Sequence, residues 1–411
     1  MAGIEQASQQ ALNETEEMSM DIAAANKDDI EGKVNTNTAE VKEIRNEAFL
    51  VTFSADDPED PKNWPKKIKW GVTLALSATG LNRIMISTMM APAIDTIAKD
   101  LNMTTTESTM ALSVYLLATA FGPLIIGPLS EAYGRKRIIH TTNIWFLAWN
   151  LLCGFSNSKG LLIASRLLAG FGASAVYTVA YGVLGDVWRP EQRGRSLSLY
   201  LLVPLTGAAI GPIVGGFIVE YSNWRWMFWA TTILQGLVEV CSLPIVHETY
   251  APVLLRRRAI AWRQETGDSR YYAEVEAYES GRSSAWKLRN SLSRPLRLLA
   301  FHPIIQMQAI LGGINYGIMY FAISTFSNLY VSAYGESISI SGLHYIALCT
   351  GEITGAQLCG PLMDYIYRTM KTRAGDNHHP ELRIPLLLPS VLFTPAVSSY
   401  TVGPPSTIFP G

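Results

Sequence analysis

The chain has 411 residues and a net charge of −1, and its composition is 48% hydrophobic but only 16% charged. The charges gather in links between apolar segments, several of which reach the roughly 20 residues that cross a bilayer. A near-zero net charge implies no general attraction to nucleic acid. The four cysteines form no CxxC pair, so we expect small packing residues and neither disulfides nor metal ligands. These features predict an all-α polytopic membrane protein.

The N-terminal segment, residues 1–69, is expected to be a disordered cytoplasmic tail. It carries eleven acidic and four basic residues up to position 50, too little apolar surface to fold alone. No basic region followed by an apolar run marks a cleaved signal peptide. The stretch 57–70 adds prolines, lysines and tryptophans, which is typical of an approach to a membrane surface.

The first predicted helix, 70–97, contains Asn82 and Arg83. An intramembrane arginine is a functional-site hypothesis by default, so we consider both residues for substrate contact. Structural pairing of Arg83 is an equally weighted alternative. The following external link holds the sequon Asn102-Met103-Thr104, so Asn102 is a candidate glycosylation site.

A basic hairpin turn joins the next two predicted helices, 108–130 and 138–155. The positive-inside rule places this turn on the cytoplasmic face. Glu131 lies at the membrane edge, where an unpaired carboxylate is costly, and the glycines permit a tight turn. The turn is either a simple orienting signal or a conformational gate, and its residues of interest are Gly127, Glu131, Gly134, Arg135, Lys136 and Arg137.

The fourth and fifth predicted helices, 161–187 and 197–219, carry two further signals. Arg166 lies one turn into the membrane and precedes glycines that let another helix approach, which favours a functional arginine. Asp186 ends the fourth helix. In the fifth, glycines four apart share one face, beside a proline that removes a backbone hydrogen bond; the residues are Gly207, Gly211, Pro212, Gly215 and Gly216.

The sixth predicted helix, 224–246, completes an N-terminal half at 70–246 and contains Glu239, for which we prefer a boundary carboxylate over a proton site. A basic cytoplasmic loop, 247–300, leads to a partial second half at 301–396. Its helices are expected at 303–331, 340–365 and from 384. The string at 360–368 echoes the string from 127, as an internal repeat of two halves would.

These motifs resemble the major facilitator superfamily. The string at 127–137 is similar to its loop between helices 2 and 3, G-x-L-[SA]-[DE]-x-x-G-R-[KR]-[KR]. The D-P-x-x-P-x-N-W string at 57–64, the E-T-Y-A-P-V-L-L string at 248–255 and the G-x-x-x-G-P-x-x-G-G string at 207–216 resemble its fungal twelve-helix drug:proton antiporters, which export polyamines and other organic molecules.

The resemblance implies proton-coupled export of a small organic molecule by alternating access. It implies that Glu131, Arg135 and Asp186 close the cytoplasmic side, that Arg166 takes part in proton coupling, and that the glycines and Pro212 set the helix bending that favours export. It also implies no cofactor beyond the proton gradient, and as partners a small-molecule substrate, protons and the lipid bilayer. We expect a monomer in the plasma membrane, with the vacuolar membrane as an alternative.

The chain departs from this family at its end. The expected helix 9 stops after 384–393, and the tail 397–411 has no membrane character. Codons for G-L-L-I-Y-G-W-A-A-Q-Y, shifted by one nucleotide, encode V-S-S-Y-T-V-G-P-P-S, which matches 397–406, so we expect a frameshift or misplaced intron boundary. Three alternatives stay open: a truncated non-functional relic, a proton-coupled importer, and a membrane enzyme, for which no catalytic cluster is found.

Overall fold

The computed structural model describes residues 49–279 and 284–347, together with 350–351, 353–355, 365 and 369–370. Throughout these ranges the regular secondary structure is helical, apart from one isolated bridge between Leu50 and Tyr272. The chain divides into two compact units: Phe53–Leu254 with Gly281–Gly411, and Met1–Thr52 with Leu255–Ser280. Each unit is described by itself.

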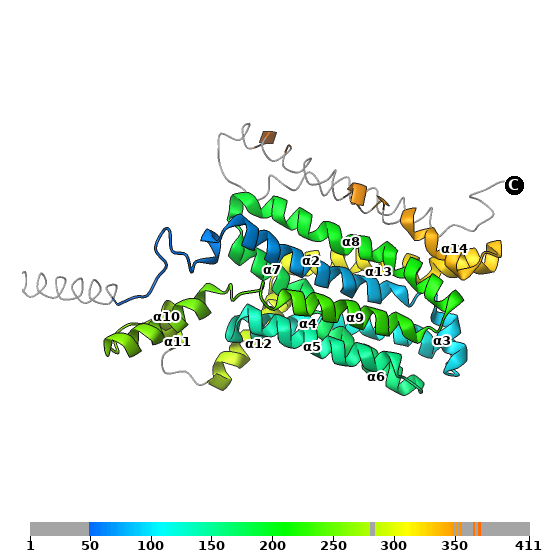
Figure 1. Ribbon diagram of the computed structural model, residues 1–411, viewed down its shortest axis with the longest axis horizontal. Coiled ribbons are helices and arrows are strands. Elements are labelled where there is room, and N and C mark those ends of the chain that lie inside the picture. Colours follow the sequence, from blue (N-terminus) through cyan, green and yellow to red (C-terminus); the bar gives the residue numbers. More distant parts are fainter. Residues whose placement is uncertain are drawn as a thin grey trace, which may run out of the picture. The chain divides into compact units, whose positions relative to one another are not determined.

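The larger unit is built around a bundle of long helices (Figure 1). Short polar caps separate the helices: Thr104 and Glu107 form a capping box, and Ser158 accepts a hydrogen bond from the backbone N–H of Leu161. The bundle helices are α2 (Lys66–Met89), α4 (Thr105–Tyr133), α5 (Arg135–Gly154), α6 (Lys159–Ala173), α7 (Ala175–Val187), α8 (Pro190–Tyr221) and α9 (Arg225–Ser242).

Two helices expected as single segments are divided. The first expected helix ends at Met89, and a short α3 (Ile94–Asp100) follows, because Pro92 lacks an amide hydrogen and disfavours helix for the residue before it. The fourth is split at Ser174 into α6 and α7. The Ser174 amide still donates to the carbonyl of Gly170 (3.1 Å), so the two pieces continue each other.

Apolar side chains lie both inside the bundle and on its outer faces. Met85, Phe146 and Phe228 belong to one buried cluster, whereas Phe121 and Leu237 are about three-fifths exposed. Large exposed apolar side chains on long helices are typical of a surface that contacts the hydrocarbon core of a membrane. Within the described part, four helical segments are long and apolar enough to cross a membrane: Thr105–Tyr133, Lys159–Val187, Gln192–Tyr221 and Pro303–Tyr334.

The approach to α2 is ordered from residue 53 onward, which corrects the expectation of a disordered tail reaching residue 69. Backbone and side-chain hydrogen bonds hold this segment, and Trp64 packs against a buried apolar cluster. The amide nitrogen of Asn63 donates to the carbonyls of Ala55 (2.9 Å) and Asp57 (3.1 Å), and Asp60 caps the short helix η1 (Pro61–Asn63). The proline stiffness that predicted a membrane approach also limits the entropy lost on ordering.

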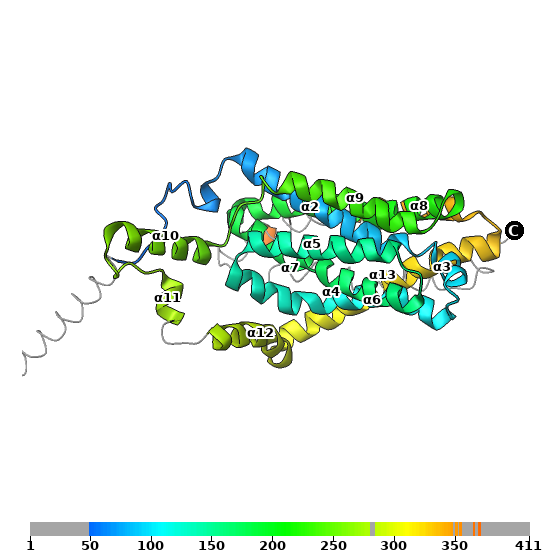
Figure 2. The same cartoon turned by 60° about the horizontal axis from the view of Figure 1, so that its bottom comes forward.

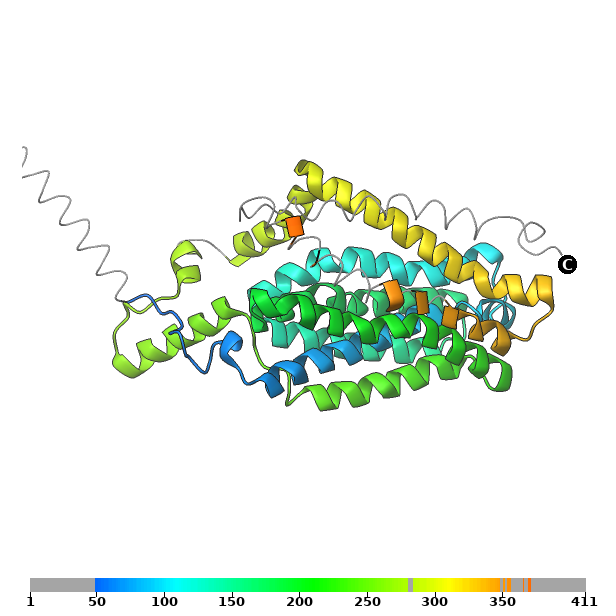
Figure 3. The ribbon, with the colours of Figure 1, turned by 90° about the horizontal axis from the view of Figure 1, so that it is seen from above.

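Helix α12 (Ser284–Phe301) ends the expected loop, and the second half begins with α13 (Pro303–Tyr334), followed by α14 (Ile338–Leu343). Figure 3 shows α13 as a long helix beside the bundle. α14 packs against α8, where the amide of Ser339 donates to the carboxylate of Glu220 (2.8 Å). The rest of the expected second half, the helix from 384, the tail 397–411 and residues 1–48 lie outside the described residues, apart from the few positions given above.

The smaller unit contains most of α10 (Ala251–Thr266), together with α11 (Glu274–Glu279). Val51, Ala259 and Ala273 form its small apolar core. The guanidinium of Arg263 pairs with the carboxylate of Glu276 at 2.8 Å. The predicted loop 247–300 is therefore largely helical, since both these helices and α12 fall within it.

Candidate functional site

The turn between α4 and α5 depends on Gly134. This glycine has φ of +99° and ψ of 151°, a conformation that residues with a side chain rarely adopt. A Cβ atom here would also collide with the carboxylate of Glu248. Gly134 thus fits both the turn and the close approach of a segment more than a hundred residues away.

Arg135 lies at the centre of a buried polar group, called here the Arg135 cluster, with Ser130, Asp186 and Glu248. Its Nε donates to Asp186 Oδ2 (3.3 Å), and one terminal nitrogen donates to Ser130 Oγ (2.7 Å). Glu248 Oε1 accepts from the backbone amide of Arg135 (2.8 Å) and from those of Thr249 and Tyr250 (each 3.1 Å). The cluster ties α4, α5 and α7 to the segment after α9.

The remaining residues of the turn lie around this cluster. Glu131 and Arg137 are exposed, and Lys136 is half-buried. The structure therefore brings Arg135 and Asp186 together, as expected, but uses Glu248 where the sequence suggested Glu131. Gly127 packs against Thr178 of α7, where an added Cβ would lie 3.0 Å from the threonine methyl.

Arg166 is fully buried between α2, α4 and α6. Its Nε donates to the carbonyl of Ala111 (3.3 Å), one terminal nitrogen donates to the carbonyl of Ile86 (3.4 Å), and its guanidinium lies 4.3 Å from the ring centre of Tyr115. In the described part of the chain its hydrogen-bond acceptors are backbone carbonyls. Arg166 therefore joins helices but has no ion-pair partner there.

Gly207, Gly211 and Gly215 form one face of α8, called here the glycine face. This face packs directly against α2. Added Cβ atoms at Gly207 and Gly211 would lie 2.8 Å from the carbonyl oxygen of Leu81 and 2.5 Å from that of Met85, and at Gly215 one would collide with Met89. α8 remains helical through Pro212. An added Cβ atom at the neighbouring Gly216 would instead lie 2.8 Å from the carbonyl oxygen of Ile338 on α14.

Asn82 and Arg83 turn away from α8, toward α5 and α9. The Asn82 amide donates to Gln235 Oε1 and to the carbonyl of Thr231 (each 3.1 Å), and Arg83 donates to Asn143 Oδ1 (2.8 Å). Both side chains are fully buried. Asn102 is exposed with φ of +52°, at the end of α3.

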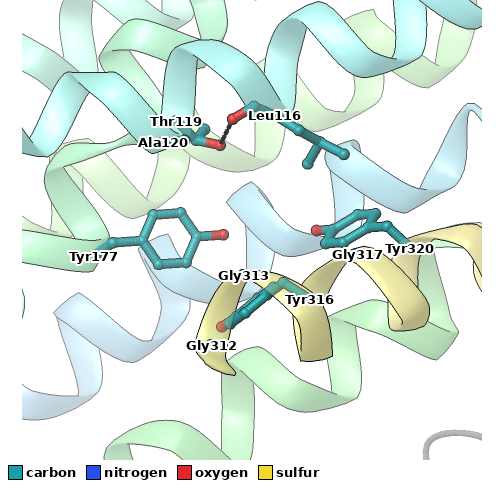
Figure 4. A pocket seen from close by; sticks show the side chains of 9 residues that line it. All are labelled: Leu116, Thr119, Ala120, Tyr177, Gly312, Gly313, Tyr316, Gly317 and Tyr320. Atoms are coloured by element: carbon teal, nitrogen blue, oxygen red, sulfur yellow. Dashed lines mark hydrogen bonds between the residues drawn. The ribbon is translucent and has the colours of Figure 1, made fainter. Parts of the chain in front are cut away.

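A pocket of about 440 Å³ lies between α4, α7 and α13. Figure 4 shows Tyr177 from α7 and Tyr320 from α13 directed into it from opposite sides, with Tyr316 below. Neither Asn82 nor Arg83 lines this pocket. Tyr320 also contacts α2, because its hydroxyl lies 3.2 Å from Ser87 Oγ. The full lining is Leu116, Thr119, Ala120, Tyr177, Gly312, Gly313, Tyr316, Gly317 and Tyr320.

Sequence analysis missed four side chains that the structure brings into these sites: Glu248, Tyr177, Tyr316 and Tyr320. Glu248 begins a string noted only for its resemblance, and no local pattern shows that its carboxylate reaches Arg135. The tyrosines lie on apolar helices, where a single aromatic residue is ordinary. The glycines at 312, 313 and 317 were a usable signal, because closely spaced glycines on one helix predict a face that packs near another helix.

The long apolar helices, their buried arginines and a pocket between two groups of helices define a multi-pass α-helical membrane protein. A family model of the Major Facilitator Superfamily matches residues 75–406, and the chain belongs to this superfamily. Its members are transporters, so the expectation of a membrane transporter rather than an enzyme is confirmed.

Fungal efflux pumps are among the similar proteins. The chain is 69% identical over 307 residues to "Probable efflux pump mfs2" of Aspergillus flavus, covering 75% of this chain and 72% of that one. It is 38% identical to "Efflux pump vrtL" of Penicillium aethiopicum, covering 82% and 67%. A bacterial homologue of the human lysosomal transporter Spinster, solved inward-facing and unoccupied, is 15% identical with a TM-score of 0.48 over 75% of this chain and 64% of that one.

Proposed function

We propose that this transporter exports a small organic molecule in exchange for protons, by alternating access. The pocket between α4, α7 and α13 carries this proposal, because it lies between helices of the first half and the first helix of the second half. A site between two halves can be exposed to either side when one half rocks against the other. Efflux pumps among the relatives support the outward direction.

The pocket lining favours an uncharged, partly aromatic substrate. None of its nine lining residues carries a charged side chain, whereas three tyrosines offer flat apolar faces and hydroxyl groups. A polyamine would require carboxylates for its ammonium groups. Of the substrates that the sequence left open, a neutral aromatic metabolite or drug therefore fits better than a polyamine.

The Arg135 cluster would close the cytoplasmic side in this proposal, with Arg135 and Asp186 as its ion pair and Glu248 as the fixed acceptor. The glycine face of α8 would let α2 and α8 move as one body. The N-terminus would lie in the cytoplasm and Asn102 outside, where it would be open to glycosylation. The plasma membrane remains the expected location, with the vacuolar membrane as the alternative.

The test uses Nile red, a neutral fluorescent aromatic dye, in everted membrane vesicles that contain the full chain. An exporter exchanging dye for protons accumulates the dye when the vesicle interior is made acidic, and stops when a protonophore removes the gradient. Dye accumulation in right-side-out vesicles on external acidification would instead support the importer. No gradient-driven movement of any neutral aromatic probe would support the alternative of a chain that does not transport.

A further inference from the structure

His140 of α5 and Glu239 of α9 face each other inside the membrane-spanning bundle. His140 Nδ1 lies 2.6 Å from Glu239 Oε1, and the two side chains are only 12% and 8% exposed. Figure 2 shows α5 lying between α9 and α6. Neither residue belongs to the Arg135 cluster, the pocket or the glycine face.

The pair continues into a buried chain of hydrogen bonds, called here the Glu239 network. The second carboxylate oxygen, Oε2, accepts from the side-chain amide of Asn143 (2.7 Å), and the amide oxygen of Asn143 accepts from the guanidinium of Arg83 (2.8 Å). A carboxylate, an imidazole, an amide and a guanidinium thus connect α9, α5 and α2. Asn143 can serve both neighbours because its amide NH2 group donates to Glu239 while its amide oxygen accepts from Arg83.

Arg83 is a buried cation that depends on this network. Its guanidinium lies 3.3 Å from the ring centre of Phe146, and in the described part of the chain its Nε and one terminal nitrogen have no hydrogen-bond partner. A buried charge without a counter-charge is strongly destabilising. Glu239 is the carboxylate that reaches Arg83 through Asn143, so ionised Glu239 balances the charge of Arg83.

The other groups close to the network are a tyrosine, a second arginine and a serine. The Tyr115 hydroxyl from α4 donates to the carbonyl of Arg83 (3.2 Å), and its ring lies against Arg166 of α6. On α9 itself, Ser242 Oγ lies 3.4 Å from Glu239 Oε2.

We infer that the His140–Glu239 pair is a proton-binding site of this transporter. The inference rests on the proposed proton-coupled export and deepens it, because Arg166, the residue implied in coupling by resemblance, keeps its proton at every physiological pH. In the unprotonated state the hydrogen on His140 Nδ1 is donated to the ionised carboxylate of Glu239, and the additional proton, which comes from water, binds at His140 Nε2. The Nε2 atom of His140 has no partner among the described residues, which leaves it open to receive a proton.

Proton binding would change the balance of charge around α2. Without the proton, the Glu239 carboxylate compensates Arg83 across Asn143. With the proton, the pair no longer carries a net negative charge, and Arg83 is left uncompensated in the bundle. The opposite side of α2 packs against the glycine face of α8. A change in the contacts of α2 with α5 and α9 therefore acts on a helix that borders the second half.

The experiment is an infrared pH titration of the purified full chain in nanodiscs, which needs no substrate. We expect a titration step that contains both carboxylate and imidazole bands and shifts in heavy water. Glu239→Gln should abolish the carboxyl part, Glu239→Asp should retain it, and His140→Gln should abolish the imidazole part. Glu265→Gln, an exposed carboxylate on α10, is the matched control and should leave the step unchanged.

The outcomes separate this site from the proposed function. A step that is identical in wild-type protein and in Glu239→Gln would overturn the proton site. Should Glu239→Gln fail to fold, His140→Gln and Glu239→Asp decide, because both keep a hydrogen-bonding side chain in place; an unchanged step in His140→Gln would also overturn it. A step that behaves as expected in a protein that moves no neutral aromatic probe would uphold the site and reject the proposed export.

Discussion

Two buried arginines of this transporter differ in whether a carboxylate lies beside them. Arg135 has Asp186 beside its side chain and Glu248 against its backbone amide, whereas Arg166 has backbone carbonyls as its acceptors in the described part of the chain. The same residue type therefore forms an ion pair in one place and a helix-joining contact in another. Neither arrangement follows from the position of the arginine along its helix.

Replacing the carboxylate of Asp186 should weaken the Arg135 cluster. Asp186→Asn keeps the shape but leaves the largely buried guanidinium without its counter-charge, which we expect to cost about 1–3 kcal/mol. Thermal unfolding of the purified protein, followed by intrinsic tryptophan fluorescence, measures this loss. Glu131→Gln is the control, since Glu131 is exposed and its substitution should change the midpoint little. An equal loss in both variants would show that Glu131 belongs to the cluster after all.

Asp100 gives a pH dependence that lies outside the membrane-spanning segments. Hydrogen bonds from the indole of Trp224 (3.0 Å) and the guanidinium of Arg225 (2.9 Å) hold the pKa of Asp100 below its usual value. A lowered pKa contributes stability that is present above the ordinary aspartate pKa and is lost as the pH falls through the lowered value.

Asp100→Asn should therefore be less stable than the parent protein near neutral pH, and the difference should shrink as the solution is acidified. Thermal midpoints measured from pH 7 down to about pH 3 test this expectation. Asp95→Asn on the same helix α3 is the control, and its difference from the parent should not follow the same course. A constant difference for Asp100→Asn across this range would contradict the assignment.

At the scale of elements, close helix contact at α2 and α8 depends on glycine. Gly207, Gly211 and Gly215 let the backbones of the two helices meet, as their spacing of four residues suggested. The sequence predicted a packing face but not its partner. Only the structure shows that the face meets α2 and that Gly216 meets α14 instead.

Adding a methyl group to this face should separate the two helices. In Gly211→Ala the new Cβ atom meets backbone and Thr88, which cannot move aside as a flexible side-chain end would. Overpacking of this kind costs about 1–3 kcal/mol, and we expect a lower thermal midpoint with slower Nile red transport. Gly236→Ala on α9 has open space around the new atom and should be neutral or slightly stabilising. Equal stability of both variants would argue against the close contact.

The pocket is a property of the whole molecule, because its walls come from α4, α7 and α13. Residues 119 and 316 are almost two hundred positions apart, yet they border the same space. The sequence placed substrate contacts at Asn82 and Arg83, whose polarity stood out in an apolar helix. The structure instead uses them to hold α2 to α9 and α5.

Filling the pocket should block transport without disturbing the bundle. Thr119→Trp places an indole in the space of about 440 Å³, and a clash costing about 1.4 kcal/mol in dye binding lowers affinity tenfold. Nile red transport in everted vesicles measures the effect. Thr109→Trp is the control, because Thr109 lies on the same helix, is exposed and lines no part of this pocket. Undiminished transport by Thr119→Trp would place the substrate elsewhere.

The sequence by itself determined that this protein is helical, crosses a membrane several times and belongs to a family of transporters. Those properties rest on local features: apolar length, charges confined to links, and short glycine and arginine motifs. Only the tertiary structure decided that Glu248 meets Arg135, that Arg83 leads through Asn143 to Glu239 and His140, and which tyrosines face one pocket. Such pairings depend on which helix faces meet, and contacts between residues far apart in the chain are settled by packing rather than by any local pattern.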